Sequence, residues 1–188
     1  MSKIAQSGVL FGIVAALQLG CASTPTTRPQ ESIAIAELDQ SFDISVPVSK
    51  LALRVPKAGF KRSAPAVVAG STANPRYFMF KDTARGIILS GWFEPARRFP
   101  GVKEPPVGML QGEPLPHRNV SFEKLGSWDV VLYDSSFRSA ITSNLQAHLV
   151  QADTWIKLHL SGYPNRSPAE QRALLIETFR SIQIQERQ

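Results

Sequence analysis

The chain of 188 residues has only one cysteine, Cys21. A single thiol cannot form a disulfide within the chain, so the fold must be stabilised by packing. The sequence also lacks an apolar run of the roughly 20 residues that a membrane-spanning helix needs. The apolar stretch from Gly8 to Ala16 is shorter than this, and Gln18 follows it. This stretch is typical of a cleavable export signal rather than of a membrane span.

Recognisable catalytic motifs are also lacking. The sequence contains no Gly-x-Ser-x-Gly, no His-Glu-x-x-His, no phosphate-binding glycine loop and no dinucleotide fingerprint. We therefore expect no enzymatic activity, no catalytic residues and no cofactor. The excess of basic over acidic side chains is modest, 21 against 15, and it is spread along the chain without a basic stripe. Such a surface favours contact with anionic lipids or envelope polymers, and we expect no nucleic-acid binding.

The first 21 residues have the order of an export signal. Lys3 gives a positive start, the apolar stretch follows, and Gly20 precedes Cys21. This layout resembles a bacterial lipoprotein signal peptide with its lipobox, although Gln18 and Leu19 stand where that family has leucine and a small residue. The resemblance implies that residues 1–20 are removed and that Cys21 is acylated. The alternatives are an ordinary secretory signal or a buried structural cysteine.

The rest of the chain divides into a linker and a folded part. Residues 21–32 are small and polar, which predicts a lipid-anchored flexible linker. Residues 33–188 have the length of one domain, and we expect a single α+β domain there. By analogy with lipoprotein sorting, Ala22 indicates the outer membrane, with the protein facing the periplasm of a bacterial envelope.

Alternating and apolar runs predict several antiparallel strands. Residues 51–55 alternate, residues 77–80 and 87–93 predict a central hairpin covered on both sides, and residues 120–125 and 128–133 predict a second pair. The last hairpin is the clearest, with Ala152-Asp153 as a two-residue turn. In that register Leu145 faces Leu160 on one side of the sheet, and His148 faces Lys157 on the other.

The chain ends with a strong helix signal. Ser167 and Glu170 form a capping box with Pro168 at the first helical position, and residues 175, 176, 179 and 182 make an apolar stripe. We place Arg172 on the outer, solvated side of this helix. Strands followed by a terminal helix predict an α+β fold, a central antiparallel sheet with the helix packed on it.

Two segments carry a further resemblance. The entry Leu51-Ala-Leu-Arg-Val-Pro-Lys-Ala-Gly-Phe60 and the closing strand, loop and helix from Trp155 to Ile184 resemble PsbP/Mog1-like domains. This resemblance implies a helix-covered antiparallel sheet and a role in binding, assembly or stabilisation, without a shared catalytic set. It also implies a first helix, for which residues 63–73 are the candidate.

Six residues form a candidate binding surface. His148 and His159 are diagonal neighbours on one sheet face in the predicted register, and they could share a metal ion or be ordinary surface residues. Because Lys157 faces His148 and would repel a cation, we expect no metal. Trp92 and Trp155 would line a groove or belong to the core. The other two candidates, Arg97 and Arg98, lie in a proline-rich loop at 95–118 that is either a docking segment or a surface insertion.

These features predict a lipid-anchored, non-catalytic accessory protein of the envelope. It would bind an envelope protein or polymer, with the membrane contacted through the lipid on Cys21. One alternative is a carrier that holds a small apolar ligand between sheet and helix. The other is a hydrolase without a recognisable motif.

Overall fold

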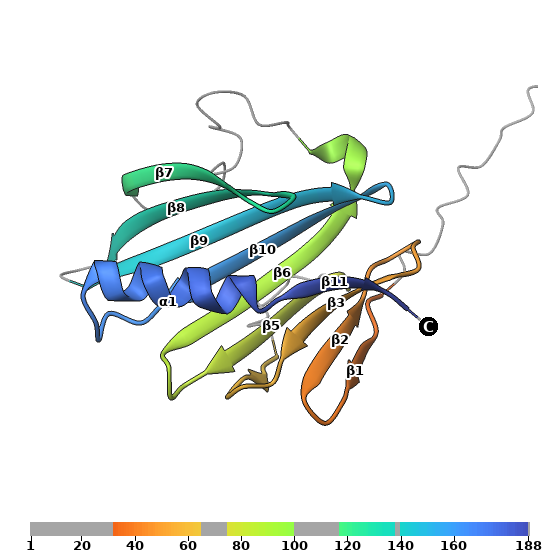
Figure 1. The fold of residues 1–188 in the computed structure, drawn as a ribbon, viewed down its shortest axis with the longest axis horizontal. Helices are drawn as coiled ribbons and strands as arrows, with labels where there is room; N and C mark the ends of the chain where they lie inside the picture. The colour runs from red at the N-terminus through yellow and green to blue at the C-terminus, as the bar shows by residue number, and fades with distance from the viewer. Residues whose placement is uncertain (1–31, 65–74, 100–116, 138–139, 188) are drawn as a thin grey trace, which may run out of the picture.

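The protein folds as two antiparallel sheets and a helix. The computed structural model describes residues 32–64, 75–99, 117–137 and 140–187 (Figure 1). The larger sheet has the order β4-β5-β6-β10-β9-β8-β7 and the smaller the order β1-β2-β3-β11. The larger sheet is made of β4 (Lys61–Arg62), β5 (Tyr77–Asp82), β6 (Ile87–Pro95), β7 (His117–Leu125), β8 (Trp128–Phe137), β9 (Ala140–Gln151) and β10 (Thr154–Gly162). The smaller sheet is made of β1 (Ile35–Glu37), β2 (Ser41–Ser45), β3 (Leu51–Pro56) and β11 (Gln183–Glu186).

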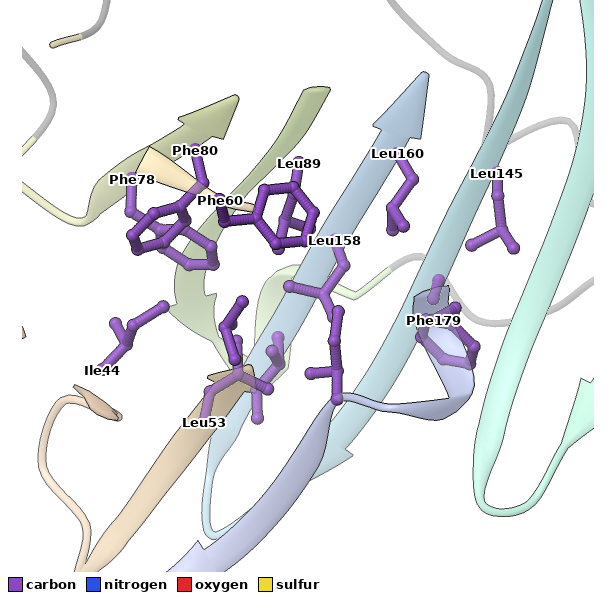
Figure 2. Close-up of a cluster of buried hydrophobic side chains, with 14 of the residues drawn as sticks. Ile44, Leu53, Phe60, Phe78, Phe80, Leu89, Leu145, Leu158, Leu160 and Phe179 are labelled. Carbon is purple, nitrogen blue, oxygen red and sulfur yellow. The ribbon is translucent and has the colours of Figure 1, made fainter. Parts of the chain in front are cut away.

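One face of the larger sheet carries the main hydrophobic core. Helix α1 (Pro168–Arg180) packs on β9 and β10, and the chain then leads directly into β11 of the smaller sheet (Figure 1). Figure 2 shows how side chains from both sheets and from α1 meet in this core. Ile44 and Leu53 come from the smaller sheet, Leu145 and Leu158 from the larger sheet, and Phe179 from α1. The predicted α+β fold is therefore confirmed.

The last hairpin has the register that the sequence predicts. Leu145 pairs with Leu160 and His148 with Lys157. Ala152 and Asp153 both have positive φ, at 47° and 56°, as a type I′ turn requires. A two-residue turn leaves little freedom of register, which is why this part of the sheet could be predicted.

The first predicted hairpin forms, but it is not central. Strands β5 and β6 pair, with Tyr77 opposite Trp92. Beyond β5 lies only the two-residue strand β4, and Tyr77 and Met79 are half-buried rather than covered. The expectation of a hairpin covered on both sides was therefore wrong. Apolar side chains at positions 77 and 79 suggested a second packed layer, but in the structure they lie near the edge of the sheet.

The helix begins at the predicted capping box. The Ser167 hydroxyl accepts from the Glu170 backbone, and the Glu170 carboxylate accepts from the Ser167 backbone. Leu175, Phe179 and the following Ile182 are buried as expected. The prediction that Arg172 lies on the solvated side of the helix was wrong, because its half-buried side chain bonds to Asp134 on β8. The candidate first helix falls mostly in residues 65–74, outside the described residues.

Candidate functional site

The side of the larger sheet opposite α1 is the candidate site, and we call it the helix-free face. On β9, Leu145 and Ala147 point into the core, so Gln146 and His148 point to the helix-free face. Six neighbouring strands each contribute one residue to a row across this face, in which every residue is paired with the next one on the adjacent strand. The row consists of Tyr77, Trp92, Lys157, His148, Asp129 and Lys124.

His148 is the most constrained group on this face. Its side chain is fully buried, and its Nδ1 accepts a hydrogen bond of 3.1 Å from the indole Nε1 of Trp155. The proton of the neutral ring therefore sits on Nε2, which has no hydrogen-bond partner among the described residues. Burial, together with the positive charge of Lys157, lowers the pKa of His148 to about 3. The ring is therefore neutral at physiological pH.

Two aromatic rings pack against this histidine. The His148 and Trp155 rings lie 5.6 Å apart between centroids at an interplanar angle of 22°. Phe99 lies 5.4 Å from Trp155 and 6.2 Å from His148. Phe99 follows the short helix η1 (Ala96–Arg98), and the Ala96 backbone donates to the Asp153 carbonyl at the tip of the last hairpin. These contacts fix the end of η1 on the helix-free face.

A second polar cluster surrounds Tyr133. Its hydroxyl accepts from the Gln146 side chain at 3.1 Å, and its ring stacks on His159 with an interplanar angle of 12°. The His159 Nε2 lies 3.2 Å from the Asn144 Oδ1, which can only accept, so Nε2 is the donor. His117 meets the Tyr133 ring edge-on at 4.8 Å. Hydrogen bonds and ring contacts thus link these side chains, although the buried His117 Nε2 has no hydrogen-bond partner among the described residues.

The remaining candidate residues lie beside these clusters. The Lys157 ammonium sits 4.5 Å from the centroid of the Trp92 ring, and Tyr77 stacks on the same ring at 6.4 Å. Arg98 forms an exposed ion pair with Glu94, and Arg97 is exposed.

The structure therefore places all six candidate binding residues on the helix-free face or at its η1 end. Four of them, Trp92, Trp155, His148 and His159, come from adjacent strands β6, β10 and β9. His148 and Trp155 are buried, however, so they support the side chains that cover them and are not themselves open to a ligand. Within the described ranges, no three metal-binding side chains gather. Cys21 lies outside the described residues, and no described helix is long and apolar enough to cross a membrane.

The predicted proline-rich loop at 95–118 is shorter at both ends than expected. Pro95 completes β6, residues 96–98 form η1, and β7 starts at His117. Residues 100–116 lie outside the described residues. The residues on either side of them, Phe99 and His117, both pack on rings of the helix-free face, on Trp155 and Tyr133 respectively.

Sequence reasoning missed the polar network around Asp134. Asp134 is buried, and its carboxylate accepts from Asn119, Ser143 and Arg172 at 2.9, 2.8 and 3.2 Å. Burial alone would raise the pKa of Asp134, but these bonds and the Arg172 charge lower it below its usual value. A pattern could not reveal this network because Asp134 and Arg172 are 38 positions apart in the chain.

A second feature that the sequence did not indicate is a groove on the outer side of the smaller sheet. It has a volume of about 560 Å³, and its floor is formed by small residues including Ala34, Ala36 and Ala52. The ion pair between Arg54 and Asp43, with bonds of 2.8 and 2.7 Å, lies in this groove.

Comparisons with known proteins give similar structures but no family. No protein-family model matches the chain, and no curated protein matches it at a significant level. The solution structure of cyanobacterial PsbP (CyanoP) from Synechocystis is similar, with 14% identity and a TM-score of 0.48, over 84% of this chain and 99% of that chain. A crystal structure from Bacteroides thetaiotaomicron has 10% identity and a TM-score of 0.42, over 74% of this chain and 46% of that chain. Neither comparison is close enough to support a functional inference.

Proposed function

We propose that this chain is a lipid-anchored, non-catalytic accessory protein of the bacterial envelope. It binds a partner protein with the η1 end of the helix-free face, including Arg97 and Arg98 and the segment between Phe99 and His117. The observation that carries the proposal is that both flanks of this segment pack on the same sheet face. A rigid sheet that fixes both ends of a loop is a common way for proteins to present a binding loop.

The electrostatics of the face favour binding over acid–base catalysis. A general base works best when its pKa lies near the operating pH. The pKa of His148 is lowered to about 3, and its Nδ1 is already occupied by the Trp155 indole. Ser143 is no better placed as a nucleophile, because it is fully buried and donates to Asp134. Both groups therefore support the fold rather than chemistry on a substrate, His148 on the helix-free face and Ser143 on the opposite side, next to α1.

The carrier alternative finds no support in the packing between α1 and the larger sheet. Leu175 and Phe179 of α1 are buried in the main core together with Leu145 and Leu158. The best-defined pockets among the described residues lie at the smaller sheet and at β5, not between α1 and the larger sheet. An apolar ligand between helix and sheet would require α1 to move.

The membrane anchor is tested separately from partner binding. In bacteria, the full chain should fractionate with membranes and carry the mass of an acylated cysteine, and Cys21→Ser should lose both properties. With eleven residues between the cysteine and Ile33, the linker reaches at most roughly 36 Å, so the partner should lie close to the membrane. Unchanged fractionation and mass in Cys21→Ser would remove the anchor from the proposal.

Partner binding is tested by crosslinking in intact cells. A photoreactive amino acid replaces Arg98 at the η1 end, and in a matched control it replaces Glu177, which is exposed on α1. We expect a discrete crosslinked protein from position 98, none from position 177, and loss of the product when residues 102–116 are deleted. Equal labelling from both positions, or none from either, would contradict the proposed surface.

A further inference from the structure

Strand β7 is an unusually long sheet edge. Within the described residues, the other three edge strands, β1, β4 and β11, have three, two and four residues, whereas β7 has nine. Edge strands present unpaired backbone groups to other chains, and proteins usually keep them short. Val120 and Phe122 of β7 are also 40% and 43% exposed. A long edge with exposed apolar side chains is typical of a strand that pairs with another chain.

The β7–β8 hairpin determines which backbone groups of β7 point outward. Leu125 pairs with Trp128 across the two-residue turn Gly126-Ser127, and Gly126 has a φ of 63°. Residues flanking such a turn exchange hydrogen bonds with each other, and this orientation alternates along the strand. The N–H and C=O groups of Ser121, Glu123 and Leu125 therefore face β8. Those of Phe122 and Lys124 face outward.

The geometry points to antiparallel pairing of β7 with β7 of a second copy of this chain. A two-fold axis perpendicular to the sheet relates two such strands, so paired residues must lie on the same face. Only three registers then pair residues 121–124 of both copies and also place the outward-facing backbone groups of one copy opposite those of the other. In the central register Phe122 faces Phe122 of the second copy, Ser121 faces Glu123, and Val120 faces Lys124.

Charge and the bulge select this central register from the three. A shift by two residues in one direction places Glu123 opposite Glu123 of the second copy, and like charges directly opposite one another destabilise a sheet. The opposite shift would pair Asn119 with Glu123 and Arg118 with Lys124, but the bulge interrupts the regular strand at these positions, where Asn119 has a φ of 50°. The central register avoids both problems and pairs the exposed Phe122 rings, and aromatic pairs across two strands are stabilising.

The network around Asp134 holds this edge in position. The bulge of β7 lies between Arg118 and Ser121, and Asn119 has a φ of 50° there. The Asn119 side chain donates to Asp134, and its carbonyl accepts from Arg172 of α1 at 2.6 Å. These bonds hold the bulge against the helix, so residues 121–125 continue as a regular strand. In the dimer both copies of α1 lie on one side, and the helix-free faces form one joint surface on the other.

The contact is small, so we expect weak self-association. Stable interfaces bury about 1,600 Å² in total, more than a few strand pairs and two phenylalanine rings provide. The dimer should therefore dissociate on dilution in solution. It should be favoured where an anchor concentrates the chains on a membrane. This proposal does not depend on which partner binds the helix-free face.

The test uses cysteine crosslinking of the purified full chain. Phe122→Cys should give a covalent dimer with a short bismaleimide, because the two side chains face each other. Thr83→Cys, exposed on the β5–β6 turn at the other end of the sheet, and the unaltered chain with Cys21 alone are the controls. We expect at least a five-fold higher dimer yield from position 122 than from either control. Equal yields from all three would overturn the proposal.

A second measurement does not depend on added cysteines. Sedimentation of the unaltered chain over a hundred-fold concentration range should show a reversible monomer–dimer equilibrium. Phe122→Lys should weaken the dimer at least ten-fold, because it removes the aromatic pair and places two cations opposite each other. A chain that stays monomeric throughout, or dimers unaffected by Phe122→Lys, would refute β7 pairing. A position-122 crosslink to a different envelope protein, without a homodimer, would refute the second copy as occupant.

Discussion

The buried ion pair between Arg172 and Asp134 gives the sharpest stability prediction. The Arg172 Nη2 lies 3.1 Å from the Asp134 Oδ1, and the carboxylate is 4% exposed. In Arg172→Met the apolar stem of the side chain is kept, but a buried carboxylate loses its positive partner. Removing one member of a buried pair costs about 3–5 kcal/mol. Since Arg172 is 23% exposed and Asn119 and Ser143 still donate, we expect about 2–4 kcal/mol.

The pH dependence separates this electrostatic loss from simple loss of packing. The pKa of Asp134 is lowered in the folded protein, because the bonds from its partners and the Arg172 charge outweigh the effect of burial. A lowered carboxyl pKa contributes stability that is present above the unfolded value of about 3.9 and is lost as pH falls through the folded value. The difference in unfolding free energy between the natural chain and Arg172→Met should therefore be largest at neutral pH and shrink below about pH 4.

The assay is urea unfolding of both proteins at pH 7 and at pH 3. Arg180→Met is the matched control, because Arg180 is exposed on the last turn of the same helix, and such surface changes stay within about 0.5 kcal/mol. A loss below about 0.5 kcal/mol at pH 7 would show that the pair contributes no net stability. A loss of equal size at both pH values would show that the arginine acts through packing alone.

Three further predictions concern single residues, each measured by denaturant unfolding. Gly91→Ala should cost about 1–3 kcal/mol, because its Cβ would lie 2.5 Å from Phe78 and 2.9 Å from Leu158; a neutral effect would mean that the sheet shifts easily there. His148 should make the protein lose stability as pH falls from about 6.5 towards 3, by up to about 1.4 kcal/mol per pH unit. His148→Gln should flatten this slope, and an unchanged slope would contradict its burial as a neutral ring. Ser167→Ala should cost about 1 kcal/mol by removing the helix cap, and an unchanged midpoint would contradict that role.

The parts of the fold that could be predicted depend on local signals. The turn Ala152-Asp153 determined the register of β9 and β10, and the capping box at Ser167 determined the start of α1. Of the smaller sheet, the sequence predicted only the strand at residues 51–55, within β3. The strands β1 and β11 were missed because they have only three and four residues and β11 pairs with a strand from the other end of the chain. Such short segments have too few positions to show a period.

The sequence predicted the strand register of the candidate residues but not their burial. The strand register alone placed His148, His159 and Trp155 on one face, and the structure confirms this arrangement. Register cannot say what covers a face, because covering residues come from elsewhere in the chain. Phe99, which stacks on Trp155 and His148, belongs to the segment that the sequence treated only as loop.

The chemistry of the helix-free face explains why its buried side chains are polar. A purely apolar second layer would stabilise the sheet, but rings packed on it could slide between similar positions. The bond from Trp155 to His148 and the bond from Gln146 to Tyr133 each fix a ring in one orientation. Buried hydrogen bonds of this kind favour one arrangement of the rings that they join, even though the His148 Nε2 has no partner among the described residues. On this face that arrangement positions both flanks of the proline-rich segment, so we expect substitutions such as Gln146→Leu to weaken partner binding more than they weaken folding.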